Sequence, residues 1–152
     1  MMSPPDDTPQ GRVTALQQAL QARAAGFWHL TGDGDRLEQV AFSPSPEVPA
    51  EAARAFAEAT RSVALTRDDL GVARAVRSGE TVVSRITELP ADSGSGHWLR
   101  ELGASRSVAV PIRDSRGKIW AVCSVAFGES PLSEEIVAER VRAAALGLSS
   151  PR

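Results

Sequence analysis

Residues 106–135 read RSVAVPIRDSRGKIWAVCSVAFGESPLSEE and contain the clearest structural pattern in this chain of 152 residues. Two apolar runs, 106–112 and 119–126, flank the polar break RDSRGK, which includes a glycine. Apolar runs separated by turn-forming residues are typical of paired strands. The stretch therefore predicts a β-hairpin, followed by a helix that Ser133 caps and that begins with acidic residues.

Outward from this hairpin, helices and strands follow in an order typical of an antiparallel sheet covered by helices. Apolar residues at three- and four-residue spacing predict a first helix that ends at about Gly26. The runs FWHL and RLEQVAF predict strands joined by the tight turn GDGD. Further helices are expected over 49–63 and from Thr66 or Asp68 to Gly79, before the strand TVVSRI. This order predicts an α+β fold with a central antiparallel sheet of about five to six strands.

Composition and charge place the chain among ordinary globular domains. Hydrophobic residues make up 42% of it and charged residues 24%. The net charge is −2 without a dense basic run, and no apolar run approaches the roughly twenty residues of a membrane span. We expect a cytoplasmic protein that binds neither nucleic acid nor membrane, with one domain over 11–148 between polar tails at 1–10 and 149–152.

Two segments resemble a known family. GVARAVRSGETVVS (71–84) resembles the part of GAF domains in which a helix meets a glycine turn and then the third strand. The stretch 106–135 resembles that family's central block, from a serine and an apolar strand ending in proline to an acidic helix start. The resemblance spans about residues 11–148. It implies that the N- and C-terminal helices cover one face of the sheet and that a lid, residues 86–105, covers the other.

The resemblance implies a small-molecule sensor, whose pocket would lie between the lid and the two strands of the hairpin. The family's cyclic-nucleotide signature and the lid cysteine that attaches bilins are both missing, so no particular cofactor is indicated. Terminal helices of this family commonly pair, which implies a homodimer and a separate partner protein that receives the signal. The apolar stripes of these helices would equally serve to cover the sheet within one subunit, and both roles stay open.

The candidates for the ligand site come from the lid and the hairpin. In the lid, His97 is a candidate donor to an anion and Trp98 a flat apolar cover, and two glycines within SGSGHWLREL predict a mobile backbone. Arg100 and Arg106 at the pocket mouth would favour a carboxylate, nitrate or phosphate. Each of these side chains also has a structural alternative, as a solvated group or a loop anchor. The remaining candidates, all on the hairpin, are Ser107, Ala109 and Cys123.

Cys123 is the only cysteine in the sequence, and its reactivity decides between a sensor that only binds a ligand and an enzyme that uses a thiol. One subgroup of GAF domains reduces free methionine sulfoxide with a nucleophilic cysteine and a resolving thiol. A lone thiol that alternates with aliphatic residues is expected to have a raised pKa and low reactivity. The sequence therefore favours a non-catalytic sensor. A ligand-free interaction module and a divergent sulfoxide reductase are the alternatives, and no Cys/His cluster predicts a metal site.

Overall fold

The computed structural model describes residues 8–145 and 148. Residues 1–7 of the expected N-terminal tail (1–10) and the expected C-terminal tail at 149–152 lie outside the described residues, whereas Pro9 and Gln10 of the expected N-terminal tail already belong to the first helix. In chain order the elements are α1 (Pro9–Leu20), β1 (Ala24–Leu30), β2 (Arg36–Pro44), α2 (Ala50–Ala59), β3 (Ser62–Ala64), α3 (Gly71–Ser78), β4 (Val82–Arg85), the 3-10 turn η1 (Ile86–Glu88), α4 (Gly94–Glu101), β5 (Arg106–Arg113), β6 (Ile119–Phe127) and α5 (Glu134–Ala145).

The strands form one six-stranded sheet in the order β3-β2-β1-β6-β5-β4, and each pair of neighbours is antiparallel. β5 and β6 are the predicted hairpin, with Arg106 opposite Phe127 and Arg113 opposite Ile119. The carboxylate of Asp114 accepts two backbone hydrogen bonds within the turn. The predicted α+β fold with a central antiparallel sheet is therefore confirmed.

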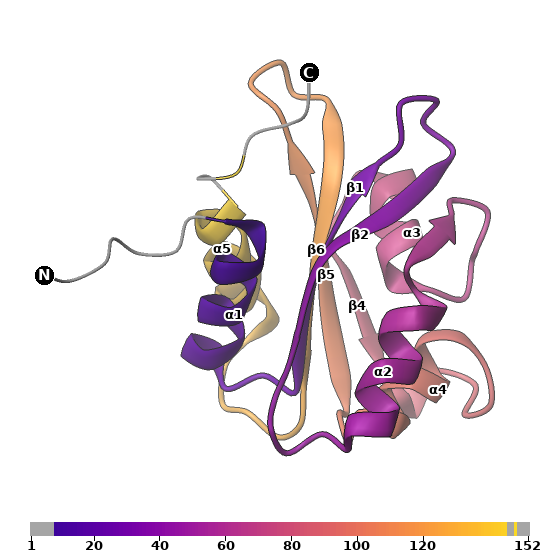
Figure 1. Ribbon diagram of the computed structural model, residues 1–152, viewed down its shortest axis with the longest axis vertical. Helices are drawn as coiled ribbons and strands as arrows, with labels where there is room; N and C mark the ends of the chain where they lie inside the picture. The colour runs from indigo at the N-terminus through magenta and orange to yellow at the C-terminus, as the bar shows by residue number, and fades with distance from the viewer. Residues whose placement is uncertain (1–7, 146–147, 149–152) are drawn as a thin grey trace, which may run out of the picture.

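Helices cover both faces of the sheet, with α1 and α5 on one side and α2, α3 and α4 on the other (Figure 1). Alternate side chains of the central strands enter these two layers. Val110, Cys123 and Val125 pack toward α1 and α5. Ala109 and Val122 pack toward the other layer, beneath α3. The N- and C-terminal helices thus share one face, as the resemblance implied.

The first helix ends earlier than the apolar spacing indicated. It stops at Leu20, where Gln21 adopts a left-handed backbone with φ of 52°, and not at Gly26. Ala24 and Phe27 belong to β1, which pairs with a neighbour on each edge. These residues are apolar because both faces of β1 are buried, and their helical spacing is incidental.

The helix expected over 49–63 is also shorter than predicted. It ends at Ala59, and Ser62–Ala64 forms the edge strand β3 beside β2. A strand of three residues is too short to show an alternating pattern. The alanine-rich composition of the preceding residues therefore predicts a helix that continues through this strand.

The expected C-terminal end of α3 and the expected N-cap of α5 are confirmed, whereas the expected N-cap of α3 is wrong. Gly79 ends α3 with φ of 73°, and the hydroxyl of Ser133 accepts a hydrogen bond from the amide of Ile136 in the first turn of α5. The N-cap of α3 is Leu70, which provides no side-chain cap, in place of either polar candidate.

One substitution tests the tight packing at the centre of the sheet. The indole of Trp28 folds back over Gly26, where an added Cβ would lie 2.4 Å from Cη2. Trp28 is 1% exposed, and its Nε1 donates to the carbonyl of Thr60 over 2.7 Å, so displacing the ring would strain or break this buried hydrogen bond. We expect Gly26→Ala to lower the free energy of unfolding by about 1 to 3 kcal/mol, measured by urea denaturation.

Gly32→Ala is the matched control for this variant, because no atom lies within 4 Å of the added Cβ. We expect it to change the free energy of unfolding by no more than about 0.5 kcal/mol. Equal stability of the two variants would contradict the proposed overlap of Trp28 with Gly26.

Candidate functional site

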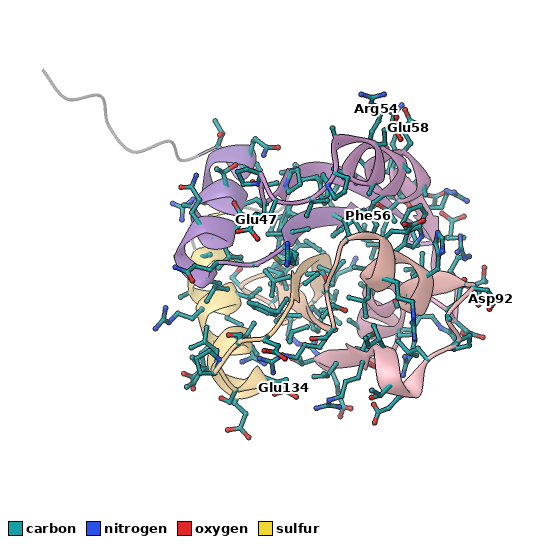
Figure 2. The ribbon with its side chains drawn as sticks, turned by 90° about the horizontal axis from the view of Figure 1, so that it is seen from below. Glu47, Arg54, Phe56, Glu58, Asp92 and Glu134 are labelled. Atoms are coloured by element: carbon teal, nitrogen blue, oxygen red, sulfur yellow. The ribbon has the colours of Figure 1, made fainter. Side chains whose placement is uncertain are left out.

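A cavity of about 50 Å³ lies between the sheet and the layer of α2, α3 and α4. Its walls include Trp28, Phe56 and Trp98, with the ring centroid of Phe56 6.5 Å from that of Trp28 and 5.6 Å from that of Trp98. Figure 2 shows Phe56 pointing from α2 into the molecule, whereas Arg54 and Glu58 point outward. A concave, mostly apolar space with a few polar groups is the usual form of a small-molecule site.

The polar side chains that line the cavity are hydroxyls, of which those of Thr60 and Ser95 are hydrogen-bonded. Ser107 on β5 and Ser124 on β6 both line it, and neither side chain has a hydrogen bond to another described residue. Ser84 on β4 is the register partner of Ser107, and its buried Oγ also has no partner among the described residues. Buried hydroxyls are normally paired, so the unpaired hydroxyl of Ser84 is unusual. Ser107 and Ser124 are half-buried, and their hydroxyls are available to a bound molecule or to water.

The lid is fastened by close backbone packing. An added Cβ on Gly94 would lie 2.2 Å from the carbonyl oxygen of Asp69, outside the lid, and one on Gly96 would lie 1.9 Å from that of Pro90, within the lid. The amide of Ser95 also donates to the Asp69 carbonyl over 2.7 Å. The mobile backbone expected from these glycines stays a prediction. The structure gives them a packing role, because they allow a close approach that no larger residue permits.

Of the three lid candidates, the structure brings only Trp98 to the cavity. His97 lies outside the cavity wall, with a side chain 38% exposed and its Nε2 3.9 Å from Oε1 of Glu101. Arg100 donates to lid backbone carbonyls, including that of Ile86 over 3.3 Å. Successive helix residues point in different directions, so Trp98 and its neighbours in α4 cannot all face the same cavity.

The hairpin candidates are divided between the two faces of the sheet. Ser107 lines the cavity, and Ala109 packs beside it in the apolar cluster beneath α3. Cys123 and Arg106 face α1 and α5 instead. The expectation of one cavity above Ser107, Ala109 and Cys123 is corrected in this respect, because the sheet register directs the cysteine to the opposite face.

Cys123 is chemically sheltered on that face. It is 3% exposed among aliphatic side chains, and burial raises the pKa of its thiol to about 12. The thiolate is the reactive form of cysteine, so this residue is unsuited to nucleophilic or redox chemistry in the folded protein.

We expect the native protein at about pH 8 to resist alkylation of Cys123 by iodoacetamide, whereas protein unfolded in guanidinium chloride reacts fully. Intact-mass spectrometry measures the extent of labelling. The unfolded sample is the control for reagent activity. Labelling of the native protein at the unfolded rate would contradict the buried position.

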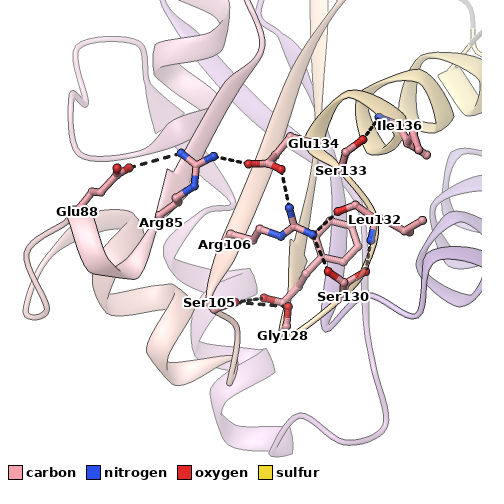
Figure 3. Close-up of polar contacts among 11 residues, drawn as sticks. Arg85, Glu88, Ser105, Arg106, Gly128, Ser130, Leu132, Ser133, Glu134 and Ile136 are labelled. Atoms are coloured by element: carbon pink, nitrogen blue, oxygen red, sulfur yellow. Dashed lines mark hydrogen bonds and ion pairs between the residues drawn. The ribbon is translucent and has the colours of Figure 1, made fainter.

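Arg106 belongs to an ion-pair network on the α5 side of the sheet (Figure 3). Its Nη1 donates to Oε2 of Glu134 over 2.7 Å, and its guanidinium lies over the ring of Phe127, 5.5 Å from the centroid. Arg85 donates to the other oxygen of Glu134 and also pairs with Glu88. The Arg106 guanidinium is thus engaged with the start of α5 and does not face the cavity.

The pKa of Glu134 lies below its ordinary value, chiefly because its own backbone amide donates to the carboxylate. The hydrogen bond from Arg85 and the charge of Arg106 act in the same direction. A carboxyl group with a lower pKa in the folded state stabilises the fold while it is ionised. That stabilisation is present above the unfolded pKa and is lost as the pH falls through the folded pKa.

We expect Glu134→Gln to lower the free energy of unfolding by about 1 kcal/mol near pH 7, since it removes a partly exposed double ion pair. The difference from wild type should shrink below the ordinary glutamate value of 4.5. Urea denaturation across this pH range measures it. Glu135→Gln is the control, because Glu135 is the exposed neighbour of Glu134. An equal loss of unfolding free energy in both variants would contradict a specific role for Glu134.

Several residues that line the cavity are not among the site candidates predicted from the sequence. Phe56 and Leu70 reach it from outside the expected lid and floor, and only the tertiary packing places them there. Ser124 carries a local signal, since it is a single hydroxyl within an apolar strand. An isolated polar residue in a buried strand is thus the sequence feature that points to this site.

Within residues 8–145 and 148, no group of three or more His, Cys, Asp and Glu side chains is arranged to hold a metal ion. The helices in this described part of the chain are all too short or too polar to cross a membrane.

A family model described as the GAF domain matches residues 10–142. Since the match covers most of the chain, the protein belongs to the GAF domain family. Domains of this family are commonly sensor or signalling domains. No curated protein shows a significant similarity to the sequence.

Several solved structures share the fold at low identity. The type II free methionine-R-sulfoxide reductase from Thermoplasma acidophilum is 16% identical, with a TM-score of 0.63 over 91% of this chain and 85% of the reductase. The GAF domain of a two-component sensor histidine kinase from Bacillus halodurans is 12% identical, with a TM-score of 0.63 over 93% and 92% of the two chains. The second GAF domain of DevS from Mycobacterium smegmatis is 14% identical, with a TM-score of 0.59 over 90% and 87%. At these identities the likeness shows a common fold.

Proposed function

We propose that this GAF domain is a sensor that binds a small molecule in the cavity between the sheet and α2, α3 and α4. The observation that carries the proposal is the pair of half-buried hydroxyls, Ser107 and Ser124, which line a mostly apolar space and bond to no other described residue. A region that served only for packing would favour apolar side chains there, since a hydroxyl that is partly removed from water loses hydrogen bonds.

The cavity favours a very small ligand. One water molecule needs about 10 to 15 Å³ of such space, so about 50 Å³ holds roughly three to five non-hydrogen atoms. A larger ligand would require α2 or α4 to move. The anionic ligand expected from the sequence has less support, because Arg100 and Arg106 are bonded elsewhere.

We propose α5 as the element that carries the signal. Ser107 and Arg106 are consecutive residues of β5 on opposite sides of the sheet, so a shift of the strand under a bound ligand would displace both. Arg106 holds Glu134 in the first turn of α5. A separate protein would then recognise the altered helix.

The homodimer through the terminal helices stays a prediction, and it concerns only those helix faces that are not already buried in the subunit. The apolar stripes that suggested a helix bundle are buried within the subunit, as at Leu16, Leu20, Val137 and Val141. A dimer would instead use the outward faces of these helices, where Ile136 is 42% exposed. The cytoplasmic location likewise stays a prediction from the sequence.

The two alternatives to a sensor are a ligand-free interaction module and a sulfoxide reductase. A ligand-free interaction module would leave the cavity closed to all small molecules. The sulfoxide reductase needs a reactive thiol, and the similarity to the reductase from Thermoplasma acidophilum is one of fold at 16% identity. Because Cys123 is buried on the face away from the cavity, we do not propose this activity.

A ligand screen compares the wild-type protein with a variant whose cavity is narrower and lacks a floor hydroxyl. Ser124→Val replaces this hydroxyl by methyl groups. We expect at least one small metabolite to raise the Tm of wild type by about 2 °C or more, and this shift to disappear in Ser124→Val. Native mass spectrometry of the same samples measures the bound mass.

Ser115→Val is the matched control, since Ser115 is exposed in the β5–β6 turn. It should retain the full ligand-induced shift. A flat screen, or equal shifts in wild type and Ser124→Val, would show that the cavity is not a binding site and would favour the interaction module.

A further inference from the structure

We infer that the cavity recognises an uncharged carbonyl oxygen, such as that of a short amide, ketone or aldehyde. The donors are the first backbone amides of α3 and the hydroxyl of Ser84. This inference rests on the proposed sensor function and specifies the chemical class of its ligand.

The start of α3 has hydrogen-bond donors to spare. The amide of Gly71 donates to the hydroxyl of Ser95 over 3.1 Å, and the first backbone bond of the helix comes from the amide of Arg74. The N-cap residue contributes no side-chain bond, so the amides of Val72 and Ala73 lack an acceptor within the described chain. The helix dipole adds a partial positive charge at this end. Gly71 and Val72 both line the cavity.

Ser84 gives an independent indication at the same place. It is 2% exposed, and its Oγ has no hydrogen-bond partner among the residues that the structure describes. A Cβ added to Gly71 would lie 3.1 Å from this oxygen and 3.9 Å from the hydroxyl of Ser95. The missing side chain of Gly71 therefore leaves the Ser84 hydroxyl beside the cavity, although Ser84 is not itself one of the residues that line it.

The donor set determines the ligand group. Backbone amides only donate, so the group they bind must be an acceptor, and a carbonyl oxygen accepts two hydrogen bonds. No arginine or lysine lines the cavity, and a carboxylate there would be buried without a counter-charge. Asp69, just before α3, adds negative charge nearby, although Arg67 pairs with its carboxylate. These conditions favour a neutral acyl group whose short apolar part contacts Leu70 and Trp98.

Acetamide, with four non-hydrogen atoms, is a suitable probe for a cavity of this size. A ligand so small binds no tighter than about tens of micromolar, so nuclear magnetic resonance titration of the ¹⁵N-labelled protein is the appropriate measurement. We expect saturable shifts at the amides of Gly71, Val72, Ala73 and Ser84. Acetate, which has the same size and a negative charge, should bind at least about tenfold more weakly.

Two variants give effects that a purely structural role would not produce. Ser84→Ala removes an unsatisfied buried hydroxyl, so it should raise the Tm of the free protein by about 2 °C while it weakens acetamide binding at least about fivefold. Gly71→Ala should abolish binding, because its Cβ fills the space beside Ser84. Ser43→Ala is the control, as a buried serine on the α1 side of the sheet, and it should leave acetamide binding unchanged.

Acetate that binds as tightly as acetamide, unchanged affinity in Ser84→Ala, or the absence of saturable shifts would each overturn the inference. Xenon under pressure, an apolar probe of small cavities, separates this failure from failure of the sensor function. Xenon-induced shifts that extend from the cavity to α5, without binding of acetamide, would leave the sensor proposal standing and refute the carbonyl ligand. No shift with either probe would refute both.

Discussion

The burial of the central strands on both faces is the constraint on which the rest of this structure depends. Side chains of a strand alternate in direction, so each residue of β5 and β6 must suit one of two different environments. The face toward α1 and α5 is filled with aliphatic groups, Cys123, Phe27 and Phe127, without an interior hydroxyl from the hairpin. That continuous core contributes hydrophobic stabilisation without the cost of a cavity, whereas the opposite face contains serines and a cavity.

The parts of this arrangement that depend on local sequence could be predicted. The hairpin, its turn and the cap at Ser133 each follow from residues close together in the chain, because turn and cap chemistry act within a few positions. The direction of each face could not be predicted in the same way. Alternation shows that a strand has two faces, but only the packing of distant helices decides which face Cys123 shares with α5.

The charged residues illustrate the same limit. The acidic first turn of α5 was expected from the helix dipole alone. Its pairing with Arg106 joins residues 28 positions apart, and its pairing with Arg85 joins residues 49 positions apart. An arginine in a sequence indicates a planar donor of hydrogen bonds, and the tertiary fold determines which acceptor it meets. Here an acceptor inside the chain takes the place of the external anion that the sequence suggested.

The glycines of the lid serve close packing of the backbone. Gly94 allows the lid to lie directly against the carbonyl of Asp69, and Gly96 allows it to pack on its own carbonyl at Pro90, at distances that exclude any side chain. A segment whose composition is usual for a hinge thus contains glycines that close packing requires. Small molecules would therefore reach the interior through rotation of individual rings such as Phe56 and Trp98, and the exchange rate would depend on the bulk of those rings rather than on the length of the loop.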